Sequence, residues 1–197
     1  MIEVRRGDEL GERYRPEIAK VLVRGFAEDF SSFSTDSERL AAAFAPLLVL
    51  ENWRLALVKG APAAVAFVTE GTQEAFAPRW EPMRRELGLL RGTITHLVVR
   101  SQFVGAREGA GLPGLGEIGF VATDPAHRGR GAAKALMQAI LEEDFEDFLV
   151  LEVKDTNEAA LGLYRSVGFE EFRRRPARLA KRAGFHHYVD LRRVPQA

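Results

Sequence analysis

Two short segments of the chain carry residue types from which a chemical site could be built. The first is Arg-Gly-Arg-Gly-Ala-Ala at residues 128–133, between a predicted strand and a predicted helix. Backbone N–H groups at the start of a helix lack partners and carry the positive end of the helix dipole, so an anion can bind there. Gly129 and Gly131 let a bulky phosphate approach the backbone, and Ala132 and Ala133 keep the first turn slim. The segment therefore predicts a phosphate site, with an ordinary tight connection as the alternative.

The two common nucleotide motifs do not fit this segment. A Walker loop needs Gly-Lys-Ser/Thr, whereas Lys134 stands between Ala133 and Ala135. A dinucleotide fingerprint needs Gly or Ala at the place that Lys134 occupies. Both nucleotide interpretations are therefore poor.

The second segment is residues 157–169, which read Asn-Glu-Ala-Ala-Leu-Gly-Leu-Tyr-Arg-Ser-Val-Gly-Phe. The apolar spacing predicts an amphipathic helix, and Gly168 is suited to end it. Taken alone, Tyr164 in such a helix would be interpreted as a packing residue.

Together the two segments, with the strands before and between them, resemble the GNAT superfamily of acetyl-CoA-dependent acetyltransferases. The resemblance covers residues 117–169, whereas residues 1–70 agree only in the order of their elements and residues 71–116 match nothing specific. It implies an α/β (α+β) fold as one domain over residues 1–197, with a helical and loop insertion at about 71–116. The central sheet is expected to be mixed and mostly antiparallel, with helices on both faces and a splay between two neighbouring parallel strands.

The two parallel strands would be residues 117–123 and 148–153. In the family, the pantetheine arm of acetyl-CoA pairs with backbone in the notch between them, like an added strand. The end of the first strand would offer those backbone groups, residues 128–133 would cradle the pyrophosphate, and Asn157 would reach the pantetheine or a bound water. The residues expected to contact acetyl-CoA are Val121, Ala122, Thr123, Arg128, Gly129, Arg130, Gly131, Ala132, Ala133, Asn157, Ala160, Leu163 and Tyr164.

The resemblance also implies a catalytic acid. The family often uses a tyrosine at the position of Tyr164 to protonate the departing thiolate of CoA. A phenol with a pKa of about 10 can assist a thiol with a pKa of about 8.5. The chain has no cysteine, so it cannot form an acyl-cysteine intermediate, and direct attack by an amine in a ternary complex is favoured.

The amine must also lose a proton. At neutral pH an alkyl amine with a pKa of about 10.4 needs about 4.6 kcal/mol for this, which a base, a water chain or a lowered amine pKa must supply. Glu117 is the candidate base, because it lies on the strand beside acetyl-CoA with the side-chain parity of Gly119 and Val121. The alternative is a solvated carboxylate at the start of a strand. His96 is a weaker candidate, and its alternative is a structural histidine.

Acceptor specificity is expected in residues 25–36 and 71–116. The acceptor is predicted to be a primary amine of a small molecule. The alternatives are a protein amine, at an N-terminus or a lysine, and a non-catalytic acyl-CoA-binding regulatory module. Glu28 and Asp29 could attract a cationic amine, or could simply form the surface end of a helix.

The rest of the chain must supply the elements that hold these segments. A capping box of Thr35 and Glu38 predicts the start of a helix that runs to about residue 45. Residues 93–104 are interpreted as a helix in spite of their β-branched side chains, and the glycine-rich residues 105–116 as a loop. Other helices are expected near 8–26, 80–90 and 132–142, and other strands near 2–4, 53–58, 63–69, 170–174 and 187–191.

Composition narrows the class of protein. The 197 residues include 28 Lys plus Arg and 28 Asp plus Glu. A formal net charge of zero argues against binding nucleic acid through its phosphates. No apolar run approaches the roughly 18 residues of a membrane helix, and the first residues lack an apolar signal core, so a cytoplasmic protein is expected. The absence of cysteine excludes a zinc–thiolate site, and no metal is expected. A homodimer is expected from the resemblance alone.

A basic run lies near the end of the chain. It could neutralise the 3′-phosphate of acetyl-CoA or an acidic partner, but a solvated loop is the favoured interpretation. Its members are Arg173, Arg174, Arg175, Arg178, Lys181 and Arg182.

Overall fold

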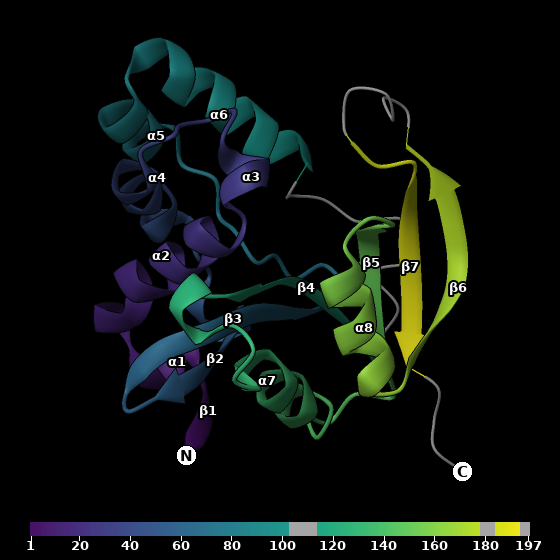
Figure 1. Ribbon diagram of the computed structural model, residues 1–197. Coiled ribbons are helices and arrows are strands. Elements are labelled where there is room, and N and C mark those ends of the chain that lie inside the picture. Colours follow the sequence, from purple (N-terminus) through teal and green to yellow (C-terminus); the bar gives the residue numbers. More distant parts are fainter. Residues whose placement is uncertain (103–113, 178–183, 194–197) are drawn as a thin grey trace.

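The computed structural model describes residues 1–102, 114–177 and 184–193, which form a seven-stranded sheet in the order β1-β2-β3-β4-β5-β7-β6 (Figure 1). All neighbouring strands are antiparallel except β4 and β5, which are parallel. The mixed, mostly antiparallel sheet predicted from the sequence is confirmed. The strands are β1 (Ile2–Arg6), β2 (Trp53–Val58), β3 (Ala61–Glu70), β4 (Leu115–Thr123), β5 (Asp147–Lys154), β6 (Phe169–Pro176) and β7 (His187–Arg193).

Helices lie on both faces of the sheet, as expected. Figure 1 shows α2, α4, α5 and α6 on one face and α7 and α8 on the other. Buried side chains of each group belong to the core on its own face. None of the helices in the described parts of the chain is long and apolar enough to cross a membrane. The helices are α1 (Gly7–Leu10), α2 (Arg15–Gly25), α3 (Ala27–Phe30), α4 (Ser37–Phe44), α5 (Trp80–Leu87), α6 (Leu89–Gln102), α7 (Ala132–Ile140) and α8 (Glu158–Ser166).

Two helix predictions have different outcomes. The ambiguous segment 93–104 is helical through Gln102, as the C-terminal part of α6, while most of the predicted glycine-rich loop 105–116 lies outside the described residues. The capping box at Thr35 is wrong by one residue. Asp36 caps α4, because its carboxylate accepts hydrogen bonds from the backbone N–H groups of Glu38 and Arg39, both at 3.1 Å.

The sheet is asymmetric in side-chain size. On β2 and β3, the face toward α7 carries the fully buried Ala56, Ala64 and Ala66, whereas the opposite face carries large side chains such as Trp53 and Phe67. Alanines let a helix backbone approach a sheet closely, because only a methyl group stands between them. The apolar side of α7 packs on this flat surface, which fixes where the helix begins relative to the end of β4.

The parallel strands β4 and β5 pair only over a short stretch and then separate. Pairing between β4 and β5 runs from Leu115 opposite Asp147 to Ile118 opposite Val150 and then stops, although β4 continues to Thr123 and β5 to Lys154. The expected splay is therefore present, and it begins after Ile118 and Val150.

A β-bulge in β4 changes the side-chain parity that the sequence suggests. The register with β3 shifts between Val65 and Phe67, and Phe120 has a φ of +47°. Gly119 and Phe120 both face the Phe67 side of the sheet, while Val121 packs against the core on the α7 side. The expectation that Glu117 and Val121 share one face is wrong, because the extra residue of the bulge reverses the alternation.

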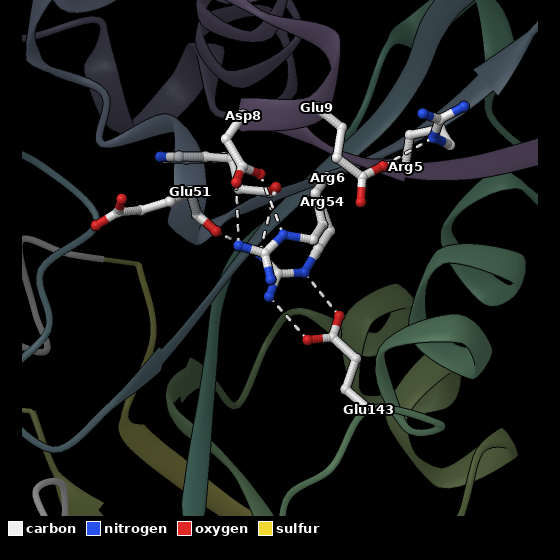
Figure 2. Close-up of polar contacts among 8 residues, drawn as sticks. Arg5, Arg6, Asp8, Glu9, Glu51, Arg54 and Glu143 are labelled. Atoms are coloured by element: carbon white, nitrogen blue, oxygen red, sulfur yellow. Dashed lines mark hydrogen bonds and ion pairs between the residues drawn. The ribbon is translucent and has the colours of Figure 1, made fainter.

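The turn after α7 is joined to β2 by a partly buried ion pair between Glu143 and Arg54. Figure 2 shows the guanidinium of Arg54 meeting the carboxylate of Glu143, with Nε to Oε1 at 2.6 Å and Nη2 to Oε2 at 2.8 Å. Arg54 also donates to the carbonyl of Glu51 at 2.8 Å, and its side chain is only 7% exposed. Paired hydrogen bonds of this kind fix orientation as well as distance. The pair therefore helps to hold α7 in one place on the sheet.

We expect Glu143→Gln to lower the free energy of unfolding by roughly 1–3 kcal/mol, because it leaves a buried guanidinium with a weaker acceptor. Urea denaturation followed by circular dichroism measures this. Glu9→Gln is the matched control, since the Arg5–Glu9 pair in Figure 2 is exposed and should contribute at most about 1 kcal/mol. Equal losses in the two variants would contradict the assigned role of Glu143.

Candidate active site

The segment 128–131 forms an open turn that leads directly into α7. Gly129 and Gly131 have φ values of +71° and +80°, a region that side chains other than glycine's rarely adopt. A Cβ built on either glycine would meet no atom within 4 Å. Gly131 is the N-cap of α7 and supplies no side chain to cap it. The turn thus offers free space next to the first N–H groups of α7, which fits a phosphate.

Two cations flank this turn. Arg128 and Arg130 are exposed, and neither forms an ion pair with any residue that the structure describes. The basic run near the end of the chain differs. Arg173 and Arg175 bind Asp190, and Arg174 binds Glu171. Its other members, Arg178, Lys181 and Arg182, lie outside the described residues. Among the arginines of these two groups that the structure describes, Arg128 and Arg130 are the ones available to an anion.

The last residues of β4 present one paired edge and one free edge. Ala122 pairs with Val65 and Thr123 with Ala64 on β3. On the other side, no residue of β5 pairs with β4 beyond Ile118. The predicted residues Val121, Ala122 and Thr123 therefore lie where an extended chain could add itself to the sheet, as the pantetheine arm is expected to do.

Asn157 caps the start of α8 and is also one of the residues predicted to bind acetyl-CoA. Its side-chain oxygen caps the helix by accepting a hydrogen bond from the N–H of Ala160 at 3.1 Å. This leaves the amide nitrogen of Asn157 as the group that could donate to a bound ligand. Ala160 and Leu163 are partly buried against the core on the α7 side. The amide nitrogen of Asn157 therefore stays available for the predicted role in binding.

Tyr164 is buried in the core on the face of the sheet that α7 and α8 cover. It is 5% exposed, its ring meets that of Phe169 edge-on at 6.1 Å, and no described residue forms a hydrogen bond with its hydroxyl. Burial raises the pKa of Tyr164 well above its ordinary value of about 10. The phenol is therefore protonated at neutral pH and has its proton available for a ligand.

Glu117 lies on the opposite face of the sheet from Tyr164. Ile118 belongs to the core that contains Tyr164, so its neighbour Glu117 points to the other side, where Gly119 meets the ring of Phe67. Glu117 is 8% exposed, which makes the alternative of a solvated carboxylate wrong. The candidate acid and base thus belong to opposite faces, and β4 runs from the paired stretch with Glu117 into the notch.

The weaker sequence candidates lie elsewhere. His96 is on α6, and its Nδ1 is buried without a partner. Asp29 on α3 forms an ion pair with Lys154 at the end of β5, so its charge is already balanced, whereas Glu28 is exposed. An added Cβ on Gly25 would lie 2.6 Å from the Cβ of Ala122, so the end of α2 sits directly on the end of β4. Residues 25–30 are therefore beside the notch, as the sequence predicts for acceptor selection.

Sequence reasoning missed the residues that shape the two bulges beside the notch. Phe120 in β4 and Glu152 in β5 both have positive φ values, of +47° and +60°. Nothing in their residue types signals this, because neither is glycine. Asp190 does carry a signal, since it is an acid between the buried Val189 and Leu191 of β7.

Comparisons with known proteins agree with this geometry. The family model for the acetyltransferase (GNAT) family matches residues 65–169, more than half of the chain. RimI of Mycobacterium tuberculosis, an N-alpha-acetyltransferase, is 39% identical over 83 residues, covering 36% of this chain and 52% of RimI. An uncharacterised protein of Mycobacterium leprae is 40% identical over 87 residues, covering 38% of this chain and 24% of that protein. The chain thus matches about half or less of the length of these two relatives.

Solved structures share the fold at lower identity. An N-acetyltransferase from Staphylococcus aureus Mu50 superposes with a TM-score of 0.64 at 19% identity, covering 96% of this chain and 99% of that chain. The structure of yncA from Salmonella typhimurium, which holds its cofactor acetyl-CoA, has a TM-score of 0.58 at 12% identity and covers 97% and 92%. The splayed parallel pair, the turn before α7 and the match over residues 65–169 lead to one assignment. The chain belongs to the acetyltransferase (GNAT) family.

Proposed function

We propose that the protein transfers the acetyl group of acetyl-CoA to a primary amine, by direct attack in a ternary complex. The observation that carries the proposal is the parting of β4 and β5 after Ile118 and Val150, next to an open glycine turn at the start of α7. The pyrophosphate would bind at residues 128–133, and the pantetheine arm along Val121 to Thr123. Acetyl-CoA supplies an activated thioester, whose carbonyl carbon the amine attacks.

In this proposal Tyr164 assists the departure of the thiol. Its hydroxyl donates a hydrogen bond, and then the proton, to the sulfur as the C–S bond breaks. Because burial raises its pKa, the Tyr164 hydroxyl is protonated at neutral pH and can donate a hydrogen bond to the sulfur as negative charge develops there. A non-catalytic binding module would have no use for this hydroxyl, which forms no hydrogen bond with a described residue.

Glu117 has the complementary role of removing a proton from the attacking amine, directly or through water. Glu117 lies on β4 three residues before the bulge at Phe120, on the face of the sheet opposite to Tyr164. With no cysteine in the chain, the acetyl group cannot pass through a thiol of the protein.

The sequence predicts a small-molecule amine as acceptor, and this stays a prediction. The similarity to RimI supports a second candidate, the α-amine of a protein. The two differ chemically, because an α-amine has a pKa of about 7.7–8.0 and an alkyl amine about 10.4. A panel of polyamines, amino sugars and peptides with free N-termini, assayed by release of thiol, discriminates between them. If none of the acceptors in the panel causes release of thiol, while acetyl-CoA still binds, a non-catalytic binding module would be favoured.

We expect Tyr164→Phe to lower kcat by about 100-fold or more, with little change in the Kd of acetyl-CoA, since only the proton donor is lost. Tyr14→Phe is the matched control, because the Tyr14 hydroxyl donates to the Gly60 carbonyl on the surface. In the parent, Tyr164 should cause no fall in kcat up to about pH 10, because its pKa lies above that of a free tyrosine. Equal kcat values for the Phe variant and an active parent would rule out Tyr164 as the acid.

Glu117→Gln preserves the shape of the side chain but removes the group assigned to accept the proton of the amine. It should therefore lower kcat/KM by about 100-fold at pH 7. The deficit should shrink as pH rises toward the pKa of the amine, where the acceptor is already deprotonated. Rates from pH 6.5 to 10 at acceptor concentrations well below KM would show this, with Glu158→Gln on the exposed start of α8 as the control. A deficit that is constant across this range would argue against Glu117 as the base.

Gly131→Ala should weaken acetyl-CoA binding at least tenfold, because its φ of +80° strains an alanine and the new methyl group enters the space assigned to the pyrophosphate. Gly71→Ala is a matched control. Gly71 also has a positive φ, of +60°, and open space around it, but follows the far end of β3. Calorimetric titration gives both Kd values, and similar losses of stability are expected. If Gly71→Ala weakened binding as much, the turn would not be the phosphate site.

A further inference from the structure

Asp190 is a carboxylate held entirely inside the protein at the centre of β7. Its exposed fraction is 0%, and its neighbours Val189 and Leu191 are fully buried apolar residues. Burying a charge costs several kcal/mol unless it is paired and hydrogen-bonded. A charge retained at such a position therefore calls for a specific use.

The β5 strand bulges opposite this carboxylate. Val150 pairs with Leu191 and Val153 pairs with Val189, so Leu151 and Glu152 together face Asp190 alone. Glu152 has a φ of +60°, which a residue with a side chain adopts only at a cost of order 1–3 kcal/mol. The bulge begins immediately after Val150, the last residue of β5 that pairs with β4.

The carboxylate of Asp190 holds this bulge through the backbone. Its Oδ1 accepts a hydrogen bond from the N–H of Glu152 at 2.8 Å, so the amide of the strained residue has a charged acceptor. Two arginines on β6 fix the carboxylate from the other side. Arg173 Nε donates to Oδ2 at 2.7 Å, and Arg175 donates to Oδ2 from Nε at 3.1 Å and to Oδ1 from Nη2 at 3.2 Å.

The pKa of Asp190 agrees with a permanent charge. Burial alone would raise it, but the hydrogen bonds from Arg175, the Glu152 amide and Arg173 outweigh burial and hold the pKa below its ordinary value. The acceptor for the Glu152 amide is therefore ionised at neutral pH.

We propose that Asp190 is a positioning residue for acetyl-CoA: it fixes the bulge in β5 and so keeps the notch between β4 and β5 open. Two adjacent strands with free edges tend to continue pairing, because each has unsatisfied N–H and C=O groups. A bulge twists a strand away from its neighbour and interrupts the ladder. Anchored at Glu152, β5 cannot extend its pairing with β4 beyond Val150, and the edge of β4 stays free for the pantetheine arm. This inference rests on the proposed function.

The test compares two ligands, acetyl-CoA and the nucleotide fragment that forms one end of it. Adenosine 3′-phosphate 5′-diphosphate contains the part of acetyl-CoA assigned to the turn before α7 and lacks the pantetheine arm. We expect Asp190→Ala to weaken acetyl-CoA about tenfold or more, the worth of a hydrogen bond to a charged group, and to leave the Kd of the fragment unchanged. Adding Glu152→Gly to Asp190→Ala should restore most of the affinity for acetyl-CoA, because glycine adopts the positive φ without help.

A merely structural role predicts a different pattern. Asp190→Ala would then weaken both ligands together, or neither, and Glu152→Gly would rescue neither. Arg173→Gln is the matched control, because it removes a bond to Oδ2 and leaves the bond from the Glu152 amide in place. It should lower the melting temperature with less than a threefold change in the ratio of the two Kd values. A larger change in that ratio would overturn the proposal.

A measurement on the unaltered protein covers the case in which Asp190→Ala does not fold. In the absence of ligand, amide hydrogen exchange by NMR should show the Glu152 N–H protected at least about 100-fold relative to an unstructured chain. Exchange at the unprotected rate, with protection only after acetyl-CoA is added, would mean that the bulge is not preformed and would overturn the proposal. If the parent binds neither ligand, the proposed function fails instead, which is a separate result.

Discussion

The brevity of the contact between β4 and β5 is the constraint on which the rest of the structure depends. They pair only from Leu115 to Ile118, yet each stays attached on its outer side, β4 to β3 as far as Thr123 and β5 to β7 as far as Lys154. The sheet is thus continuous through residues 115–118 of β4, but it is open between the C-terminal halves of β4 and β5. An open pair of parallel edges inside a sheet leaves backbone groups unsatisfied, and a ligand with amides of its own can satisfy them.

Two residues with strained backbone conformations, Phe120 and Glu152, lie beside this opening, and different interactions stabilise them. Phe120 in β4 is held by aromatic packing, since its ring contacts those of Phe26, Phe67 and Phe76 at centroid distances of 5.3–5.8 Å. Glu152 in β5 is exposed and lacks such packing. Its backbone conformation is stabilised instead by the hydrogen bond from its N–H to the charged carboxylate of Asp190. Backbone strain of order 1–3 kcal/mol persists only where the surroundings over-determine it. Both sites meet that condition, one through apolar contacts and the other through a buried charge.

The sequence was sufficient where local signals and global structure agree. The turn at 128–133 and the helix after it follow from glycine placement and helical spacing, the parallel pair was implied by the resemblance to the GNAT superfamily, and the structure has them all. It was insufficient where one extra residue changes a register. The bulge at Phe120 turned Val121 away from the face of Glu117, and no residue type near it predicts a positive φ. The capping of α4 by Asp36 and not Thr35 is a choice between adjacent polar residues, which differ too little in energy to be separated by pattern.

The separation of Tyr164 and Glu117 by the sheet has a chemical consequence. A carboxylate and a phenol placed together would hydrogen-bond to each other, and their separation by the sheet excludes that pairing. On opposite faces, the phenol can meet the departing sulfur from the α8 side while the carboxylate faces the α2 and α6 side. In the proposed mechanism, an amine that gives its proton to Glu117 would arrive from that second face. There the end of α2 rests on Ala122, and α3 and the helices after β3 surround the approach. These are the elements in which the sequence places acceptor selection, so the choice of amine and the binding of acetyl-CoA are assigned to different faces of one sheet.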